Sequence, residues 1–175
     1  MKYKSLLSIL LGALILFGCT ATIPEQYTEV RELPAIHPNY NDITIPYNIA
    51  PLNVAYEMEG KDFVTELKVG DQTLVMKGKK TDWNLKQWQT FLGSAKGKTV
   101  LLNAYVRVDE GWVKYRPIKW RVAEESIDPY ISYRIIAPSY VTYEELSIRQ
   151  REMATFEEQM VYNNMLLSTD KDGQC

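Results

Sequence analysis

The stretch Val100-Leu-Leu-Asn-Ala-Tyr-Val-Arg-Val108 decides the fold, and the turn sequence Asp109-Glu-Gly111 follows it directly. Apolar residues occupy every second position and alternate with more polar ones: Val100, Leu102, Ala104, Val106 and Val108 against Asn103, Tyr105 and Arg107. Successive side chains of a β-strand point to opposite faces of the sheet. The alternation therefore predicts a half-buried strand that ends in a hairpin turn.

The two-residue period continues on both sides of this strand, from residue 53 to residue 122. It predicts further strands around residues 54–58, 63–69, 73–76 and 118–122. One interruption, residues 84–92, places four apolar residues on a single helical face: Leu85, Trp88, Phe91 and Leu92. Short strands, regular turn signals and one inserted helix predict a mainly β fold, an immunoglobulin-like antiparallel β-sandwich over residues 36–137.

The segments that flank this domain differ from it in composition. Before it, prolines 34, 38, 46 and 51 exclude helix, and the many Ile and Tyr residues between them predict an edge segment lying against the domain. After it, residues 142–162 contain no Gly or Pro and carry apolar residues at three- to four-residue steps, which predicts an amphipathic helix. The apolar stripe of this helix would need a partner to cover it. We expect residues 138–175 to form this connecting helix and an unsettled tail that leads into a downstream domain.

The first nineteen residues have the pattern of an export signal. Lys2 and Lys4 precede an apolar run, which ends in Leu16-Phe17-Gly18-Cys19. This ending resembles a bacterial lipobox, at which a precursor is cut before a cysteine that carries acyl chains. The alternative, an ordinary secretory signal with an incidental cysteine, calls for small residues at two nearby positions, whereas here the small residue Gly18 lies directly before the cysteine. We therefore expect a signal peptide at residues 1–18, lipid attachment at Cys19 and a tether over residues 19–35.

Charge limits the classes of partner. The chain has 20 basic and 22 acidic residues, a net charge of −2, and removal of Lys2 and Lys4 with the signal would leave 18 and 22, a net charge of −4. A mildly acidic protein without a basic tract lacks the electrostatic pattern of a nucleic-acid-binding protein. Membrane contact is expected through the lipid on Cys19 instead, with the protein exported and held at the cell envelope. Attachment to the outer membrane, facing the periplasm, is expected by analogy.

Few residues are suited to catalysis. His37 is the only histidine, and an ordinary Ser–His or Cys–His pair would have to use it. A structural role for this imidazole is expected. No phosphate-binding glycine loop or metal-ligand spacing is present, and neighbouring acids such as Glu124-Glu125, Glu144-Glu145 and Glu157-Glu158 suit solvated faces. The sequence predicts no catalytic residues and no metal site.

Aromatic residues are the remaining candidates for ligand contact. The chain has four Trp and 12 Tyr, and such rings can stack on sugars. Trp88 and Trp120 are in phase with apolar neighbours and are expected in the core. Trp112, beside the predicted hairpin turn, is expected to be exposed and is the candidate ligand contact.

Four separated stretches resemble one family in the same order. They are the run from Ile36-His-Pro-Asn-Tyr to Ala-Pro-Leu-Asn53, Asp128-Pro-Tyr-Ile-Ser-Tyr-Arg-Ile-Ile-Ala-Pro-Ser-Tyr140, Ile148-Arg-Gln-Arg-Glu-Met-Ala-Thr-Phe-Glu-Glu158, and Asn164-Met-Leu-Leu-Ser-Thr-Asp-Lys-Asp-Gly-Gln-Cys175. Together they are similar to the N-terminal region of Bacteroidetes-type envelope lipoproteins with TolB-like β-propeller repeats, often labelled cytochrome c biogenesis-like.

The resemblance implies a cofactor and a partner outside this chain. In such proteins Cys175 would open a C-x-x-C-H site for haem c, and a propeller would follow it. The second cysteine and the histidine are not in this sequence, so it holds no haem of its own. Either the sequence is a fragment of a longer protein, which we expect, or the gene ends at Cys175. The expected function is a lipid-anchored accessory or interaction module of such a protein, with its partner on residues 142–162. The alternative is a lipoprotein that binds glycans or other ligands through surface aromatics.

Overall fold

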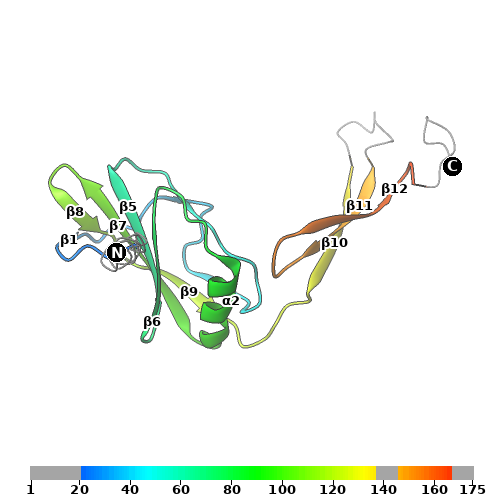
Figure 1. Ribbon diagram of the computed structural model, residues 1–175, viewed down its shortest axis with the longest axis horizontal. Helices are drawn as coiled ribbons and strands as arrows, with labels where there is room; N and C mark the ends of the chain where they lie inside the picture. The colour runs from blue at the N-terminus through cyan, green and yellow to red at the C-terminus, as the bar shows by residue number, and fades with distance from the viewer. Residues whose placement is uncertain (1–20, 137–145, 167–175) are drawn as a thin grey trace, which may run out of the picture.

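The computed structural model describes residues 21–136 and 146–166, and the fold is mainly β (Figure 1). Residues 21–129 form a body, and three further strands form a projecting arm at residues 130–136 and 146–166. The antiparallel sheets of the molecule are consistent with a β-sandwich, as the sequence predicts.

The body is built on a seven-stranded sheet. Five strands follow one another across it: β1 (Thr28–Glu29), β8 (Gly111–Lys114), β7 (Thr99–Val108), β5 (Asp62–Val69) and β6 (Gln72–Lys77). The long strand β7 also pairs through its first half with β9 (Ile118–Val122), which in turn pairs in parallel with β3 (Ile43–Ile45). The central strand predicted at residues 100–108 is thus confirmed. It is hydrogen-bonded to β5 along one edge and to β8 and β9 along the other.

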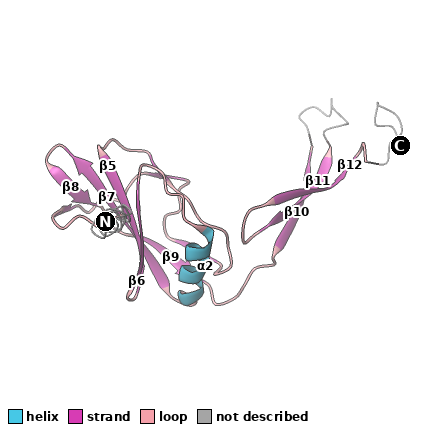
Figure 2. Cartoon of the chain, viewed as in Figure 1, coloured by secondary structure: helices cyan, strands magenta, loops and turns pink. Residues whose placement is uncertain are grey.

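A second layer covers one face of this sheet. It consists of helix α2 (Leu85–Ser94), which Figure 2 shows beside the sheet, together with the two-stranded ribbon β2 (Ile36–His37) and β4 (Ala55–Tyr56) and the proline-rich strip between these two strands. The Asn84 side chain accepts a hydrogen bond from the Gln87 amide and begins the helix, as N-cap residues do. Trp88 from the helix and Trp120 from β9 are fully buried between the layers, which confirms their predicted core positions.

Part of the segment predicted as a tether, residues 19–35, is paired with the sheet in the structure. Residues 28–29 pair in parallel with β8, the Val30 amide donates to the Lys114 carbonyl, and the Arg116 amide donates to the Glu32 carbonyl. The Lys114 ammonium lies 2.9 Å from a Glu29 carboxylate oxygen, and this contact raises the Lys114 pKa. The segment follows β8 because β8 offers it unpaired backbone groups, a long-range contact that local sequence does not reveal.

The predicted helix at residues 142–162 is wrong. Residues 142–145 lie outside the described part, and the rest form β11 (Ser147–Glu152), a turn, and β12 (Glu158–Asn163). Phe156 in the turn has a φ of 63°, a left-handed conformation that the interior of a right-handed helix does not contain. The strand β10 (Tyr130–Ile135), expected within the sandwich, pairs instead with β11 and belongs to the arm.

Burial of one tyrosine makes a prediction for alkaline pH. Desolvation raises the pKa of Tyr56 to about 12, against a smaller lowering effect of its 2.6 Å hydrogen bond with Thr65. Above pH 10 the unfolded chain loses this proton while the folded chain keeps it. Titration of Tyr56 should therefore not change the free energy of unfolding below pH 10. Between pH 10 and 12 it should lower this free energy by about 1.4 kcal/mol per pH unit.

Urea unfolding of the parent chain and Tyr56→Phe at several pH values measures this effect. The variant is expected to lose stability less steeply than the parent above pH 10. Equal slopes for the two chains would contradict the assignment of the pKa shift to Tyr56.

Candidate functional site

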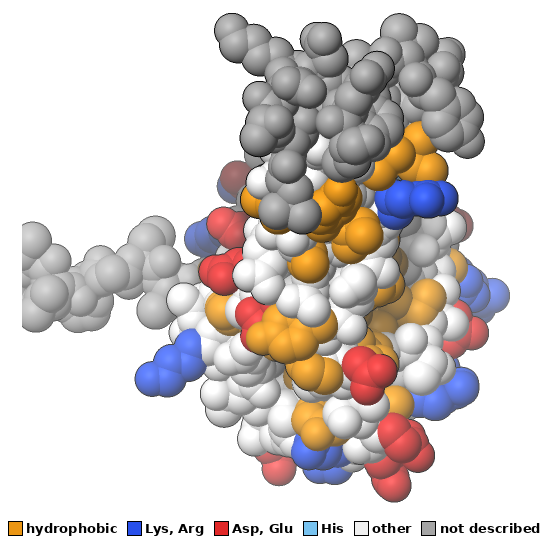
Figure 3. Space-filling view, turned by 90° about the vertical axis from the view of Figure 1, so that its right-hand side faces the viewer, with side chains coloured by type: hydrophobic (Ala, Val, Ile, Leu, Met, Phe, Trp, Pro, Cys, Tyr) orange, Lys and Arg blue, Asp and Glu red, His pale blue; other side chains and the backbone are white. Residues whose placement is uncertain are grey.

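The arm is a sheet without a core of its own. Its strands run in the order β10–β11–β12, all antiparallel. Exposed apolar side chains occur on every strand, including Ile131 at 50% exposure, Ile148 at 38% and Met160 at 55%. From the side of the arm, hydrophobic side chains are visible as separate patches among charged ones (Figure 3). A three-stranded sheet normally needs one apolar face packed on something to be stable.

Backbone pairing shows which groups of β10 face outward. The Met153 amide donates to the Pro129 carbonyl, so residues 129 and 153 form a hydrogen-bonded pair of the β10–β11 ladder. Such pairs alternate along an antiparallel ladder, which makes 131/151, 133/149 and 135/147 the next ones. The N–H and C=O groups of Tyr130, Ser132 and Arg134 therefore point away from β11. In the described part of the chain no strand pairs with this outer edge.

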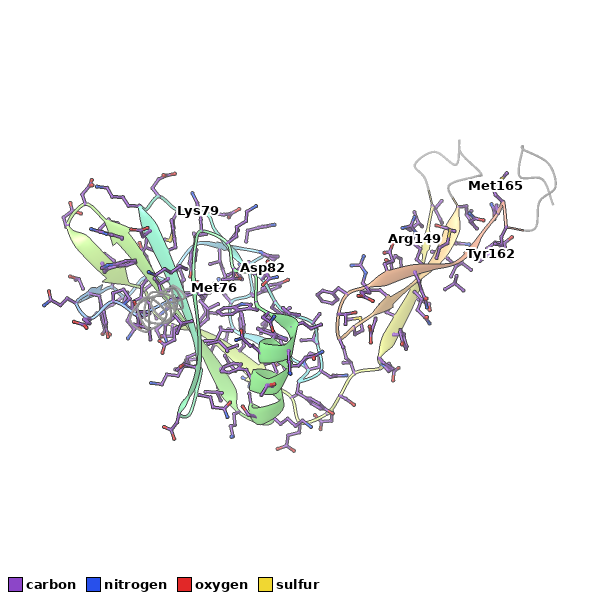
Figure 4. All side chains as sticks on the ribbon, viewed as in Figure 1. Met76, Lys79, Asp82, Arg149, Tyr162 and Met165 are labelled. Atoms are coloured by element: carbon purple, nitrogen blue, oxygen red, sulfur yellow. The ribbon has the colours of Figure 1, made fainter. Side chains whose placement is uncertain are left out.

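One face of the arm carries a polar cluster centred on Glu158. Its carboxylate accepts hydrogen bonds from Arg149, from Arg151 at 2.9 Å and from the Tyr133 hydroxyl. Arg151 also lies 5.8 Å from the centre of the Tyr133 ring. These contacts connect all three strands, and Arg149 projects from the middle strand (Figure 4). The cluster fixes the register of the arm and leaves the apolar residues around it available for contact.

The arm is joined to the body by a small number of hydrogen bonds. The Ala50 amide donates to the Met153 carbonyl at 2.7 Å, at the turn between β11 and β12. On the connecting segment, the Asn48 side chain donates to the Ile127 carbonyl and accepts from the Ile127 amide. These contacts hold the base of the arm and leave the far ends of its strands away from the body (Figure 1).

The structure describes two of the four residues that the sequence singles out, His37 and Trp112. Cys19 and Cys175 are outside the described residues. The His37 side chain is 72% exposed, with its Nδ1 3.9 Å from a Glu57 carboxylate oxygen, so the expected structural role of a satisfied imidazole is not seen. Trp112 is on β8 and is half-buried rather than fully exposed. Trp112 lines a groove.

The Trp112 groove lies at one end of the large sheet, has a volume of about 550 Å³ and includes backbone at Gly60 and Gly78. Its polar side chains come from three strands and the adjoining loops: Lys61, Asp62, Lys77, Lys79 and Arg107. Sequence reasoning selected the tryptophan but not the cations, because the strand register that gathers them joins segments far apart in the chain.

A buried polar group on the same sheet was also missed. Glu66 is 5% exposed, and its carboxylate accepts from the Asn103 side chain at 2.9 Å and from the Tyr105 hydroxyl at 3.2 Å. Burial and the nearby Glu66 charge raise the Tyr105 pKa. Tyr27 packs edge-to-face on Tyr105, so the N-terminal segment covers this group. The available signal is the polar residues at alternate positions of β5 and β7, but such alternation predicts a solvated face rather than a covered one.

The described residues were also searched for metal sites and membrane-spanning helices, and the chain was compared with known proteins. Within residues 21–136 and 146–166 there is no group of three or more His, Cys, Asp or Glu side chains that could hold a metal ion. No helix in this part of the chain is long and apolar enough to cross a membrane. No protein-family model, curated protein or solved structure matches the chain.

Proposed function

We propose that this protein is a lipid-anchored interaction module of the cell envelope and that the arm is its protein-binding element. The observation that carries the proposal is a three-stranded sheet whose strands all expose apolar side chains and which packs on no second layer of the described chain. Exposed apolar surface of this kind is characteristic of binding surfaces. Catalysis is not part of the proposal.

The occupant is a partner domain that adds an extended strand to the outer edge of β10. The outward backbone groups of Tyr130, Ser132 and Arg134 supply the hydrogen bonds of such a strand. Main-chain bonds give affinity in strand addition, and side chains at alternate positions give specificity. Ile131 and Ile135 on one face and Tyr130 on the other offer apolar contacts to the added strand.

A whole domain fits the arm better than a second copy or a lipid surface. Two-fold pairing of β10 with another copy would extend the sheet but leave Ile148 and Met160 exposed on its two faces. A lipid surface would have to accommodate Arg149, Arg151 and Glu158 among the apolar residues, at a cost of several kcal/mol in hydrocarbon. A β-rich partner domain can supply both an edge strand and a covering layer.

The position of the N-terminal segment supports this arrangement. β1 lies at the end of the body opposite the arm (Figure 1), and its pairing with β8 holds the start of the described chain on the sheet. With lipid on Cys19, the arm would point away from the membrane. The propeller of the lipoprotein family that the sequence resembles is a β-rich domain of the required kind, and haem c would belong to that part of the assembly.

Site-specific photo-crosslinking in the native cells tests the proposal. The photoreactive residue p-benzoylphenylalanine replaces Ile131 in the full chain, and Lys68, an exposed residue of the body, serves as the control position. A crosslink to one other protein domain is expected at Ile131 only. Ser132→Pro should abolish it, because proline removes an outward N–H without removing a bond between β10 and β11. Ser132→Ala should retain it.

Three outcomes would overturn the proposed binding element. They are a crosslink that survives Ser132→Pro, a crosslink only to a second copy, and a crosslink only to lipid. The anchor is tested in the same cells: Cys19→Ala should move the protein from the membrane fraction to the soluble fraction, and retention in the membrane would contradict lipidation at this residue.

A further inference from the structure

The Trp112 groove gathers positive charge on an acidic protein. Lys61, Lys77, Lys79 and Arg107 line it with Asp62 as the only acid, whereas the whole chain has a net charge of −2. Clefts lined by one sign of charge attract ligands of the opposite sign. The groove is therefore suited to an anionic ligand.

Strand register places the aromatic ring beside the charges. Trp112 pairs with Arg107 and Arg107 pairs with Asp62, so the three side chains lie in one row on the same face of the sheet. Val64 and Lys77 pair with each other in the next row on that face. Lys79 lies just beyond the end of β6 (Figure 4). A planar apolar surface is thus bordered by cationic side chains.

Two of the cations remain available for a ligand. The Lys61 ammonium lies 2.7 Å from an Asp109 carboxylate oxygen, and the Arg107 guanidinium lies 3.5 Å from an Asp62 carboxylate oxygen, so both cations have acidic partners. Among the described residues, Lys77 and Lys79 have no ion-pair partner within 4.0 Å. Lys79 contacts the face of the Phe63 ring at 5.8 Å. The ammonium groups of Lys77 and Lys79 are therefore the expected anion contacts.

The path of the chain beside the groove requires a glycine. A Cβ at Gly60 would lie 2.4 Å from Val106 Cγ1 and 3.0 Å from Phe63 Cζ, both of them in the core. A side chain at residue 60 would therefore displace core residues on the face of the sheet opposite Trp112. The glycine lets the chain pass close to the core before it reaches Lys61 and Asp62, which line the groove.

We propose that this groove binds a pyranose sugar that carries a carboxylate or phosphate group. The sugar ring stacks on Trp112, and the anionic group contacts Lys77 and Lys79. Sugar hydroxyls can bond to Asp62 and Arg107, whose side chains are 60% and 54% exposed. The proposal is independent of the arm. Two sources share this chemistry, acidic polysaccharides and the phosphorylated sugars of lipid headgroups.

Calorimetric titration of the full chain with defined probes tests the site. The anionic probes are tetragalacturonate and the deacylated, diphosphorylated glucosamine disaccharide of a lipid A headgroup. The neutral probe is maltotetraose, and inorganic phosphate is the probe for charge alone. At least one anionic sugar should bind, at least about tenfold more tightly than maltotetraose and phosphate, and binding should weaken with added salt. The anionic probe that binds more tightly identifies the source.

Variants of the groove separate stacking from charge. Trp112→Ala and the pair Lys77→Gln with Lys79→Gln should each weaken binding at least about tenfold. Lys68→Gln makes the same charge change as one of these lysine substitutions, at an exposed position outside the groove, and should leave binding unchanged. Failure of both anionic sugars to bind, equal binding of maltotetraose, or full binding by Trp112→Ala would overturn the site. None of these results affects the crosslink at Ile131.

Discussion

Replacement of Trp120 by alanine is expected to lower the free energy of unfolding by about 4 kcal/mol. The side chain is fully buried, and its indole N–H donates to the Tyr40 carbonyl at 2.8 Å. Its ring also packs edge-to-face on Trp88, with 6.3 Å between centroids. The substitution leaves a cavity between the sheet and its covering layer, and it removes the partner of a carbonyl in the proline-rich strip.

Urea unfolding followed by far-ultraviolet circular dichroism measures this loss, and Trp112→Ala is the matched control. Trp112 is half-buried on the other face of the sheet, so its removal should cost about 1 kcal/mol or less. Similar losses for the two variants, or a loss below about 1 kcal/mol for Trp120→Ala, would show that the core is not centred on the tryptophans of α2 and β9.

In the purified chain, amides of the arm are expected to exchange with deuterium at least about 100-fold faster than amides of β5 and β7. The arm buries few apolar side chains, whereas the core face of β5 and β7 includes Leu67, Leu102 and Val106, none of them exposed. Local opening of the arm therefore exposes little apolar surface and costs little free energy, while opening of β7 disrupts the core.

Hydrogen exchange monitored by NMR resolves the two groups of amides. Arg149→Gln should increase exchange further within the arm, because it removes one partner of the Glu158 cluster that connects the strands. Exchange in β5 should not change. Protection of β10–β12 equal to that of β7 in the purified chain would contradict an arm that needs a partner for stability.

The spacing of apolar residues along the sequence predicted the elements whose buried face is set by that spacing, namely β7 and α2. The alternation at residues 100–108 gave β7, and the apolar spacing at residues 84–92 gave α2 with its buried Trp88. The face that the pattern makes apolar is the face that the structure buries, except that Leu85 at the start of α2 is 37% exposed. Proline positions likewise excluded helix from the strip that contains β2 and β3.

Long-range pairing decided what periodicity could not predict. Residues 147–163 have a helix-forming composition, but Arg149 and Arg151 bind Glu158 across neighbouring strands. In the sequence they precede it by nine and seven residues, whereas side chains in contact on one helix are three or four residues apart. Thr28 and Glu29 pair with residues of β8 more than 80 positions later. The cations around Trp112 come from β6, β7 and the adjoining loops, so only the pairing of β5 with β6 and β7, and of β7 with β8, brings them together.

The most direct test of the arm as a binding element is amide exchange at Tyr130, Ser132 and Arg134, whose N–H groups point outward from β10. It is measured by mass spectrometry on peptides covering these residues, first in the purified chain and then in the crosslinked complex formed through residue 131. Strand addition predicts rapid exchange in the free chain and at least about 100-fold slower exchange of these three amides in the complex. Equal exchange in the two states would show that no strand is added to β10 and would contradict the proposed function.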